Sequence, residues 1–336
     1  MSGLLKDFLL QNPSTFTIII TDERVWELHA SHLDFIDKDK RKVFLLPASE
    51  EAKAWEQARM ILSILSQLPI DKKTLVLNFG GGVVSDIGGF VAATYKRGLR
   101  LVNVPTTLLA MIDAAIGGKN GLNFDGIKNL IGTVYLPEKV FIEPDFLHTL
   151  PDEEWLNGLG ELLKYALIGS PELWQHLQSL PKFPSEEFQF SWIDFCRQFK
   201  EAMVARDLYD TCERHVLNFG HTIGHALESL AASRGQKLSH GHAVALGCVA
   251  AAHLSVQKEG LSAADFERIA HFVKRMFPVF AITSADVPQI LRFCQQDKKN
   301  HDGTLRFVLL KNIGEAIWHC ETSETEIRQA LCFMQS

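Results

Sequence analysis

The second half of the chain holds a carboxylate and several histidines that could bind a metal ion. Glu161 and Lys164 are three residues apart and would face one side of a helix. His221 and His225 are four apart, so both rings would project from one helix side, and His240 precedes another helical segment. A carboxylate with imidazoles suits zinc, and three protein ligands with one open position are typical of a catalytic zinc site.

The spacing leaves open which of these histidines would bind the metal. The chain contains 13 histidines, so some pairs at helical spacing arise by chance. Histidines without a partner motif are expected to have no function: His215, His253, His271 and His301.

A run of glycines in the first half could bind a phosphate. The apolar segment Thr74–Phe79 is followed at once by Gly80, Gly81 and Gly82 and then by a helical pattern. Glycines after a strand let the backbone approach a pyrophosphate, while the following helix N-terminus supplies N–H donors. Ser85 stands where a strict dinucleotide motif has its third glycine, so a plain strand–helix turn explains the run equally well.

Cations and short polar side chains cluster around a second glycine pair, Gly117–Gly118. The surrounding residues suit a loop-rich anion site: Thr106, Thr107, Asp113, Lys119, Lys128 and Asn129. The helical half adds further polar residues: Lys200, Arg214, Asn218, Lys298 and Lys299. Each lysine alone is equally well explained as a solvated charge, whereas Arg214 stands beside the histidine motif.

Alternating strands and helices are predicted to position the first set of residues. The strands are 16–20, 42–46, 74–79, 101–104 and 139–142, and the helices are 50–65 and 84–95. Such alternation predicts a parallel sheet with helices on both faces.

From about Pro151 the pattern changes to long amphipathic helices. They are 153–168, 191–209, 220–232, 242–259 and 263–276, with a loop at 180–190 and a strand pair at 305–310 and 316–319. Two domains are therefore predicted, an α/β domain over residues 1–150 and a helical domain over residues 151–336.

The composition excludes several classes of protein. Of 336 residues, 46% are hydrophobic and 22% are charged, which is ordinary for a globular protein with two domains. The net charge of −6, without a basic stripe, does not favour nucleic acid. No segment resembles a signal peptide or a membrane span, so we expect a cytoplasmic protein. Six scattered cysteines without CxxC spacing are expected to be buried free thiols.

Several segments together resemble the 3-dehydroquinate synthase family. They are the run from Gly80 to Ile168, the run from Lys200 to Glu228, the stretch SHGHAVALG from Ser239 and the DKKN near residue 297. The resemblance implies a Rossmann-like α/β N-terminal domain that binds NAD, and an all-α C-terminal domain that binds metal and substrate. It implies a metal, zinc or cobalt, held by Glu161, His221 and His240, which leaves His225 for proton transfer.

The resemblance also implies contacts with NAD and with a small sugar phosphate. NAD would meet residues of the first domain: Asp22, Glu50, Lys53, Gly81, Gly82, Val83, Asp86, Thr106, Thr107, Lys128, Phe146 and Thr149. The substrate would meet Asp113, Lys119, Asn129, Lys164, Lys200, Arg214, Asn218, His225 and one of Lys298 or Lys299. Arg97 resembles the arginine that enters the partner subunit's phosphate site, which implies a homodimer.

The implied reaction converts 3-deoxy-D-arabino-heptulosonate 7-phosphate to 3-dehydroquinate and phosphate, a step of the shikimate pathway toward chorismate and the aromatic amino acids. A hydroxyl is oxidised transiently by NAD, phosphate is eliminated, the ketone is reduced again, and the opened ring closes by an aldol reaction. The cations would balance the charge of carboxylate and phosphate.

Three positions depart from the pattern of this family. His242 stands where glutamate is usual after the third motif, and Ser85 stands where glycine is common in the phosphate turn. Asp210 replaces a glutamate that is thought to accept a proton, and its carboxylate is one methylene shorter. A retracted carboxylate would slow a proton step unless water or backbone compensates.

Three other interpretations fit part of the pattern. Another sugar phosphate cyclase would share the glycine turn and the metal residues, but His225 and the run 297–299 favour the heptulosonate substrate. A metal-dependent polyol dehydrogenase would not need so many cations. An inactive NAD-binding regulatory protein would be expected to lose ligands and lysines, which are intact here.

Overall fold

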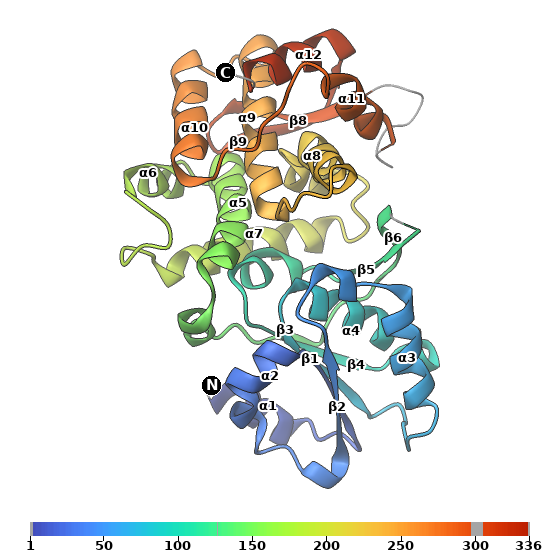
Figure 1. Cartoon of the computed structure of the whole chain (residues 1–336). Helices are drawn as coiled ribbons and strands as arrows, with labels where there is room; N and C mark the ends of the chain where they lie inside the picture. Colours follow the sequence, from blue (N-terminus) through green and yellow to red (C-terminus); the bar gives the residue numbers. More distant parts are fainter. Residues whose placement is uncertain (1–2, 126, 297–304, 335–336) are drawn as a thin grey trace. The chain divides into compact units, whose positions relative to one another are not determined.

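A computed structural model describes residues 3–125, 127–296 and 305–334. The chain forms two compact units, Met1–Pro151 and Asp152–Ser336. The first contains the strands β1 to β7, and the second contains most of the long helices (Figure 1). The predicted combination of an α/β N-terminal part and a helical C-terminal part is therefore confirmed.

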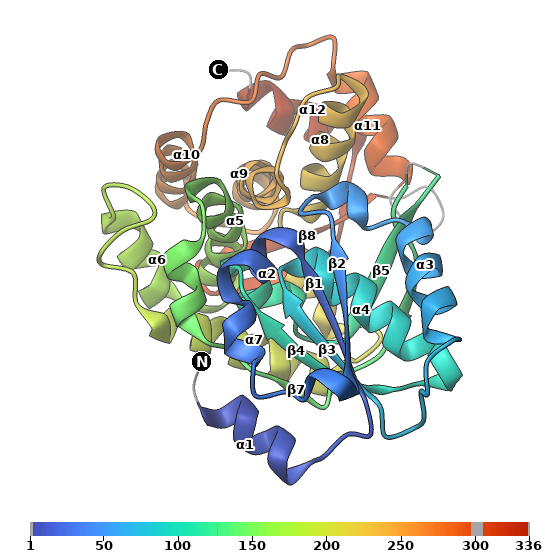
Figure 2. The same ribbon diagram turned by 60° about the horizontal axis from the view of Figure 1, so that its bottom comes forward.

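Parallel strands form the main sheet of the first unit in the order β2-β1-β3-β4-β7 (Figure 2). They are β1 (Thr17–Asp22), β2 (Arg41–Leu46), β3 (Leu75–Gly80), β4 (Arg100–Pro105) and β7 (Lys139–Val140). The central strands β1, β3 and β4 are buried almost throughout, as expected for a parallel sheet covered on both faces. The five predicted strands are confirmed, although β7 is shorter than expected.

The helices of the first unit are α1 (Gly3–Gln11), α2 (Glu23–His29), α3 (Trp55–Leu65) and α4 (Gly82–Thr94). Apolar side chains of α3 and α4 pack on those of β1 and β3 in one core. The helix predicted from residue 50 begins only at Trp55. The backbone before it pairs elsewhere, because the Asn123 N–H donates to the Lys53 carbonyl at 2.7 Å and Ala54 forms a bridge with Asn123.

The segment expected to be a loop-rich site contains an antiparallel hairpin instead. Its strands are β5 (Lys119–Phe124) and β6 (Ile127–Val134). Polar residues and glycine make up four of the six residues of β5 and half of those of β6, so the apolar alternation that identifies most strands is weak here. Among the described residues β6 pairs only with β5, and Ile127, Leu130 and Val134 are exposed on it.

The second unit is built around a buried helix, α9 (His240–Lys258). It packs against α5 (Asp152–Gly169), α8 (His221–Ser233), α10 (Ala263–Met276) and the strand β8 (Leu305–Asn312). The remaining elements are α6 (Pro171–Ser179), α7 (Phe190–Arg206), the 3-10 helix η7 (Glu213–Asn218), α11 (Val287–Gln296), β9 (Glu315–Thr322) and α12 (Glu324–Phe333).

The predicted boundaries of the second unit are corrected at two helices. α7 ends at Arg206, before the predicted Tyr209, and α9 begins at His240 rather than His242. The Ser239 side chain caps α9 by accepting a hydrogen bond from the His242 N–H, which starts the helix earlier. The helices α6, α11 and α12 were not predicted.

The six cysteines are free thiols, as expected. Cys196, Cys248 and Cys294 are buried, but the expectation of burial is wrong for Cys212 and Cys332, which are exposed. None of the helices in the described ranges is both long and apolar enough to span a bilayer.

Candidate functional site

Three donor atoms from three helices meet in the second unit. Oε1 of Glu161 lies 3.2 Å from Nε2 of His221 and 3.1 Å from Nε2 of His240. Donors bound tetrahedrally to one zinc ion are about 3.3 Å apart, because each donor lies about 2.0 Å from the metal. The donor types and the two distances to Oε1 of Glu161 therefore fit a single four-coordinate metal ion with one position left open.

A close approach of two helices brings Glu161 and His240 together. A Cβ atom at Gly160 would lie 1.8 Å from the carbonyl oxygen of Gly241, so α5 and α9 could not come this close with a larger residue. The Gly241 N–H donates a hydrogen bond to Oδ1 of Asn157 at 2.8 Å, which fixes the start of α9 on α5.

Hydrogen bonds at the far nitrogens orient both histidine rings. Nδ1 of His221 lies 3.2 Å from the Phe219 carbonyl oxygen, which can only accept, so this nitrogen carries the proton. Nδ1 of His240 lies 3.4 Å from Oε2 of Glu228. Both rings therefore direct Nε2 toward Glu161, the arrangement in which an imidazole binds a metal and donates from its other nitrogen.

The electrostatics of this cluster depend on buried charges. Burial alone would raise the pKa of Glu161, but Lys164 and the two histidines hold this pKa well below its ordinary value. Burial lowers the pKa of His221 to about 4 in spite of Glu161, so the ring is neutral at neutral pH, as a metal ligand must be. Burial opposes protonation of His240, but Glu228 and Glu161 raise its pKa to about 10, so this ring gives up the proton on Nε2 when a metal binds.

A second group of possible donors shares one residue with the first. Ligand atoms of His225, Glu228 and His240 lie within 4.8 Å of one another. The His225 ring centre is 5.3 Å from that of His221 and 6.0 Å from that of His240. His225 is thus beside the metal donors but outside the group centred on Glu161.

Asp207 organises the segment that carries Arg214. Its carboxylate accepts hydrogen bonds from the backbone N–H groups of Thr211 at 3.0 Å, Cys212 at 2.7 Å and Arg214 at 3.2 Å. Arg214 is buried, and its Nη1 donates to the Leu208 carbonyl at 2.7 Å. The types and spacing of residues in the sequence gave no reason to single out Asp207, because most of its partners are backbone groups.

The substituted position Asp210 lies in the same segment. It has a φ of 58°, and its Oδ1 is 3.1 Å from Nδ1 of His215. His215, which was expected to have no function, therefore has a defined carboxylate partner.

The other candidates of the second unit lie on neighbouring elements. Lys200 is buried on α7, and Asn218 ends η7 three residues before His221. Lys298, Lys299 and His301 lie outside the described residues.

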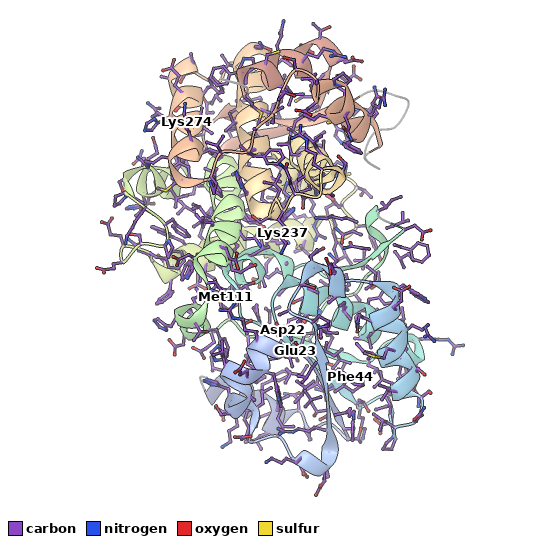
Figure 3. The ribbon with its side chains drawn as sticks, in the orientation of Figure 1. Asp22, Glu23, Phe44, Met111, Lys237 and Lys274 are labelled. Carbon is purple, nitrogen blue, oxygen red and sulfur yellow. The ribbon has the colours of Figure 1, made fainter. Side chains whose placement is uncertain are left out.

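In the first unit, three neighbouring strands end at residues expected to bind NAD. Asp22, labelled in Figure 3, ends β1. Its side chain caps α2 by accepting a hydrogen bond from the Val25 N–H at 2.8 Å. Gly81 follows β3 and caps α4, and the Thr106 N–H, after β4, donates to the Gly80 carbonyl at 3.0 Å. The carboxyl ends of parallel strands are the usual ligand-binding edge of such sheets.

This edge has features that fit a polar ligand. Oγ1 of Thr106 is buried, and no other described residue forms a hydrogen bond with it. A Cβ atom at Gly81 would lie 3.1 Å from Cγ2 of Thr107, so a larger residue would crowd the turn at the helix N-terminus. Ser85 donates its hydroxyl to the Gly81 carbonyl at 3.2 Å, so this departure from the glycine motif leaves the turn intact.

Three further candidates for cofactor binding lie close together. Nζ of Lys53 is 2.5 Å from Oδ2 of Asp86, and the Gly121 N–H donates to Oδ1 of Asp86 at 3.3 Å. Burial raises the pKa of Asp86 although Lys53 lowers it. Oε1 of Glu50 accepts from the side chain of Asn123 at 3.1 Å. Lys53 and Glu50, which follow β2, therefore contact α4 through Asp86 and the β5–β6 hairpin through Asn123.

The remaining candidates of the first unit have more varied surroundings. The Phe146 ring packs against Phe79 at 5.4 Å between ring centres, and Oγ1 of Thr149 lies 2.8 Å from Nε2 of His29, which was not singled out in the sequence.

The other candidates lie on several elements of the first unit. Val83 is in the first turn of α4, Thr107 follows Thr106, and Asp113 lies in a short π-helix. Lys119 begins β5, Lys128 and Asn129 are exposed on β6, and Arg97 is exposed at the end of a 3-10 helix.

Comparisons with known proteins cover both units. Residues 43–157 match the family described as 3-dehydroquinate synthase N-terminal, and residues 158–300 match 3-dehydroquinate synthase C-terminal. A 3-dehydroquinate synthase of Clostridium tetani is 36% identical over 97% of this chain and 87% of its own length. One of Parabacteroides distasonis is 36% identical over 88% of this chain and 84% of its own length.

A solved structure extends the likeness to the fold. It is ValA, a 2-epi-5-epi-valiolone synthase of Streptomyces hygroscopicus subsp. jinggangensis with NAD+ and Zn2+ bound. Its TM-score is 0.86 at 27% sequence identity, over 99% of this chain and 95% of that one.

Proposed function

The chain belongs to the 3-dehydroquinate synthase family, whose members are phosphate-eliminating carbon–oxygen lyases of the shikimate pathway, and we propose how its residues perform this reaction. The substrate is 3-deoxy-D-arabino-heptulosonate 7-phosphate and the products are 3-dehydroquinate and phosphate. The observation that carries the proposal is the convergence of Glu161, His221 and His240 on one point beside the buried Lys164.

The second unit would bind the metal and the substrate. Glu161, His221 and His240 would hold one divalent ion, zinc or cobalt, which acts as a Lewis acid toward a substrate oxygen. Lys164, Lys200 and Arg214 are buried cations that would bind the anionic groups of the substrate. His225 lies beside the donors without belonging to the group centred on Glu161, which suits a role in proton transfer.

The first unit would bind NAD at the carboxyl edge of its sheet. The turn at Gly81–Gly82 and the first N–H groups of α4 would bind the pyrophosphate, with the N–H groups donating hydrogen bonds to its oxygens. The buried hydroxyl of Thr106 would form a hydrogen bond with the cofactor, and the Asp22 side chain would contact another of its polar groups. NAD supplies a reversible hydride acceptor, so oxidation and re-reduction leave no net NADH.

A homodimer would complete the site through Arg97. This arginine is exposed, and the apolar side chains exposed on β6 in the same unit would pack against a second copy. The test is complementation between two inactive variants, Arg97→Ala and Glu161→Gln. A mixed dimer would contain one intact site, so random mixing should restore roughly a quarter of wild-type activity. Recovery of no activity, with exchange of subunits verified, would contradict this role of Arg97.

Substrate selection is tested by following phosphate release and NADH absorbance together. Purified protein with NAD+ and Zn2+ would be given the heptulosonate phosphate, sedoheptulose 7-phosphate or glucose 6-phosphate. We expect phosphate release from the first without accumulation of NADH. Release from another sugar phosphate instead would identify a sibling cyclase, and net NADH would identify a dehydrogenase; either outcome would overturn the proposal.

A further inference from the structure

Glu228 is a buried carboxylate beside the metal donors, and neither the residue types nor the resemblance singled it out. It is 5% exposed on α8. It follows His221 by seven residues and His225 by three, so all three side chains lie along one stripe of the helix. Its Oε2 is 3.4 Å from Nδ1 of His240.

The two nitrogens of His240 face two different carboxylates. Nε2 is 3.1 Å from Oε1 of Glu161, and Nδ1 is 3.4 Å from Oε2 of Glu228. When a metal is bound, the imidazole is neutral and has one N–H and one lone pair, so an acceptor at Nδ1 keeps the N–H there and leaves the lone pair of Nε2 for the metal. The Phe219 carbonyl does the same for His221 at 3.2 Å.

We propose that Glu228 is a positioning residue of the metal site: it accepts the Nδ1–H hydrogen bond of His240, fixes Nε2 as the metal-binding nitrogen and does not itself bind the metal. This inference rests on the proposed function of the site centred on Glu161. A carboxylate in this position also makes the imidazole a stronger ligand, because it stabilises positive charge on the ring.

The geometry distinguishes this role from direct ligation. Glu228 belongs to the second donor group, with His225 and His240, so a metal bound there would use Glu228 itself. In the first group, however, both histidines offer Nε2 to the same oxygen of Glu161, at 3.2 and 3.1 Å. Both Nδ1 atoms have acceptors outside that group, so the first group is already arranged for ligation.

The charge of the site supports the same division of roles. The other oxygen of Glu161 is paired with Lys164 at 2.5 Å, which leaves Oε1 for the metal. Glu228 then supplies the carboxylate that partners the distal nitrogen of a ligand histidine. Partners of this kind typically raise metal affinity by about 10- to 100-fold.

The test compares metal binding by the wild type with that of Glu228→Gln and Glu228→Ala. The glutamine keeps an acceptor oxygen of nearly the same shape, whereas alanine removes the acceptor. Zn2+ affinity would be measured by competition with a chromophoric chelator, and the visible spectrum of the Co2+ form would report the ligand set. Glu161→Gln serves as the ligand variant, and Glu213→Gln, half-exposed on η7, serves as the matched control.

We expect one metal ion per chain in both Glu228 variants, with affinity lowered about tenfold in the glutamine variant and up to about 100-fold in the alanine variant. The Co2+ spectrum should keep its four-coordinate form in both, whereas Glu161→Gln should change it. Unfolding of the metal-free proteins would verify that the variants fold.

Two results would overturn the proposal. Wild-type affinity in Glu228→Ala would show that the hydrogen bond has no effect on the metal. Loss of the spectrum in Glu228→Ala, with retention in Glu161→Gln, would make Glu228 a ligand of the second group. Because metal binding is measured without substrate, failure of the proposed reaction would appear separately, as a metal-loaded protein that releases no phosphate.

Discussion

Nζ of Lys164 lies 2.5 Å from Oε2 of Glu161, and both side chains are almost completely buried. The lysine therefore engages one oxygen of the carboxylate, and the two histidines face the other. A buried ion pair of this kind keeps Glu161 ionised in the absence of a metal. It also prevents the carboxylate from binding a metal through both oxygens.

Replacement of Lys164 by Met should destabilise the metal-free protein. The change removes the lysine from the buried Glu161 carboxylate and leaves only the histidines beside it, and loss of one partner of a buried pair typically costs about 3 to 5 kcal/mol. Denaturant unfolding in the presence of a chelator measures the loss. Lys258→Gln breaks the partly exposed pair with Glu326 at 2.8 Å and is the control, with an expected loss below about 1 kcal/mol. Equal losses for both variants would contradict this view of the pair.

Replacement of Gly160 by Ala should weaken metal binding. The new Cβ would lie 1.8 Å from the Gly241 carbonyl oxygen, so α5 and α9 must separate and Glu161 must move away from His240. We expect at least about a tenfold loss of Zn2+ affinity, because ligand geometry tolerates deviations of only about 0.2 Å. Gly3→Ala on α1, where the nearest atom is 3.5 Å away, is the control and should bind metal normally.

Replacement of Asp207 by Asn should lower activity without unfolding the protein. An amide can offer only one acceptor oxygen, so the backbone of Arg214 loses part of its support at 3.2 Å. A loss of about tenfold or more in kcat/KM is expected, because displaced binding groups reduce productive orientation. Phosphate release and thermal unfolding would be compared with Glu213→Gln. Unchanged kcat/KM in the Asp207 variant would exclude this role.

The stability of the second unit should depend on pH through Asp286. The hydrogen bond from Arg234 lowers the pKa of Asp286 to about 2, below the ordinary 3.8. A lowered pKa in the folded state contributes stability above about pH 4, and this contribution is lost as the pH falls toward about 2. Asp286→Asn should therefore cost about 1 to 3 kcal/mol at neutral pH and almost nothing at about pH 2.

Denaturant unfolding of the wild type and this variant across that pH range measures the effect. Asp194→Asn, at a carboxylate whose side chain is 65% exposed, provides the control and should change stability little at any pH. A difference between wild type and Asp286→Asn that does not shrink in acid would refute the assignment.

The sequence contained enough information for the sheet and for the long helices. The strands β1, β3 and β4 are short, mainly apolar runs, and β1 is rich in β-branched residues, while α10 has a clear helical period. The β5–β6 hairpin was missed because β5 is mostly polar residues and glycine, and because the apolar residues of β6 do not alternate regularly with polar ones. The helix α12 was missed too, although Ser323 and Glu326 form a capping box that could have identified its start.

The candidate site was predictable to the extent that residue types carry chemistry. Glu161, His221 and His240 could be named as donors, but only the fold brings α5, α8 and α9 together. Asp207 and Glu228 could not be assigned from the sequence, because their roles depend on backbone N–H groups and on a ring nitrogen supplied by other segments. Asp210 could be recognised as a substitution, but its pairing with His215 could not.

The most direct test of the account is a metal titration of phosphate release. Chelator-treated protein with NAD+ and the heptulosonate phosphate would receive Zn2+ in increasing amounts, in parallel with Glu161→Gln and His240→Ala. We predict no release without metal, a rise that ends at one equivalent per chain for the wild type, and no comparable rise for either variant. Full release from the metal-free wild type, or normal titration of both variants, would contradict the central claim.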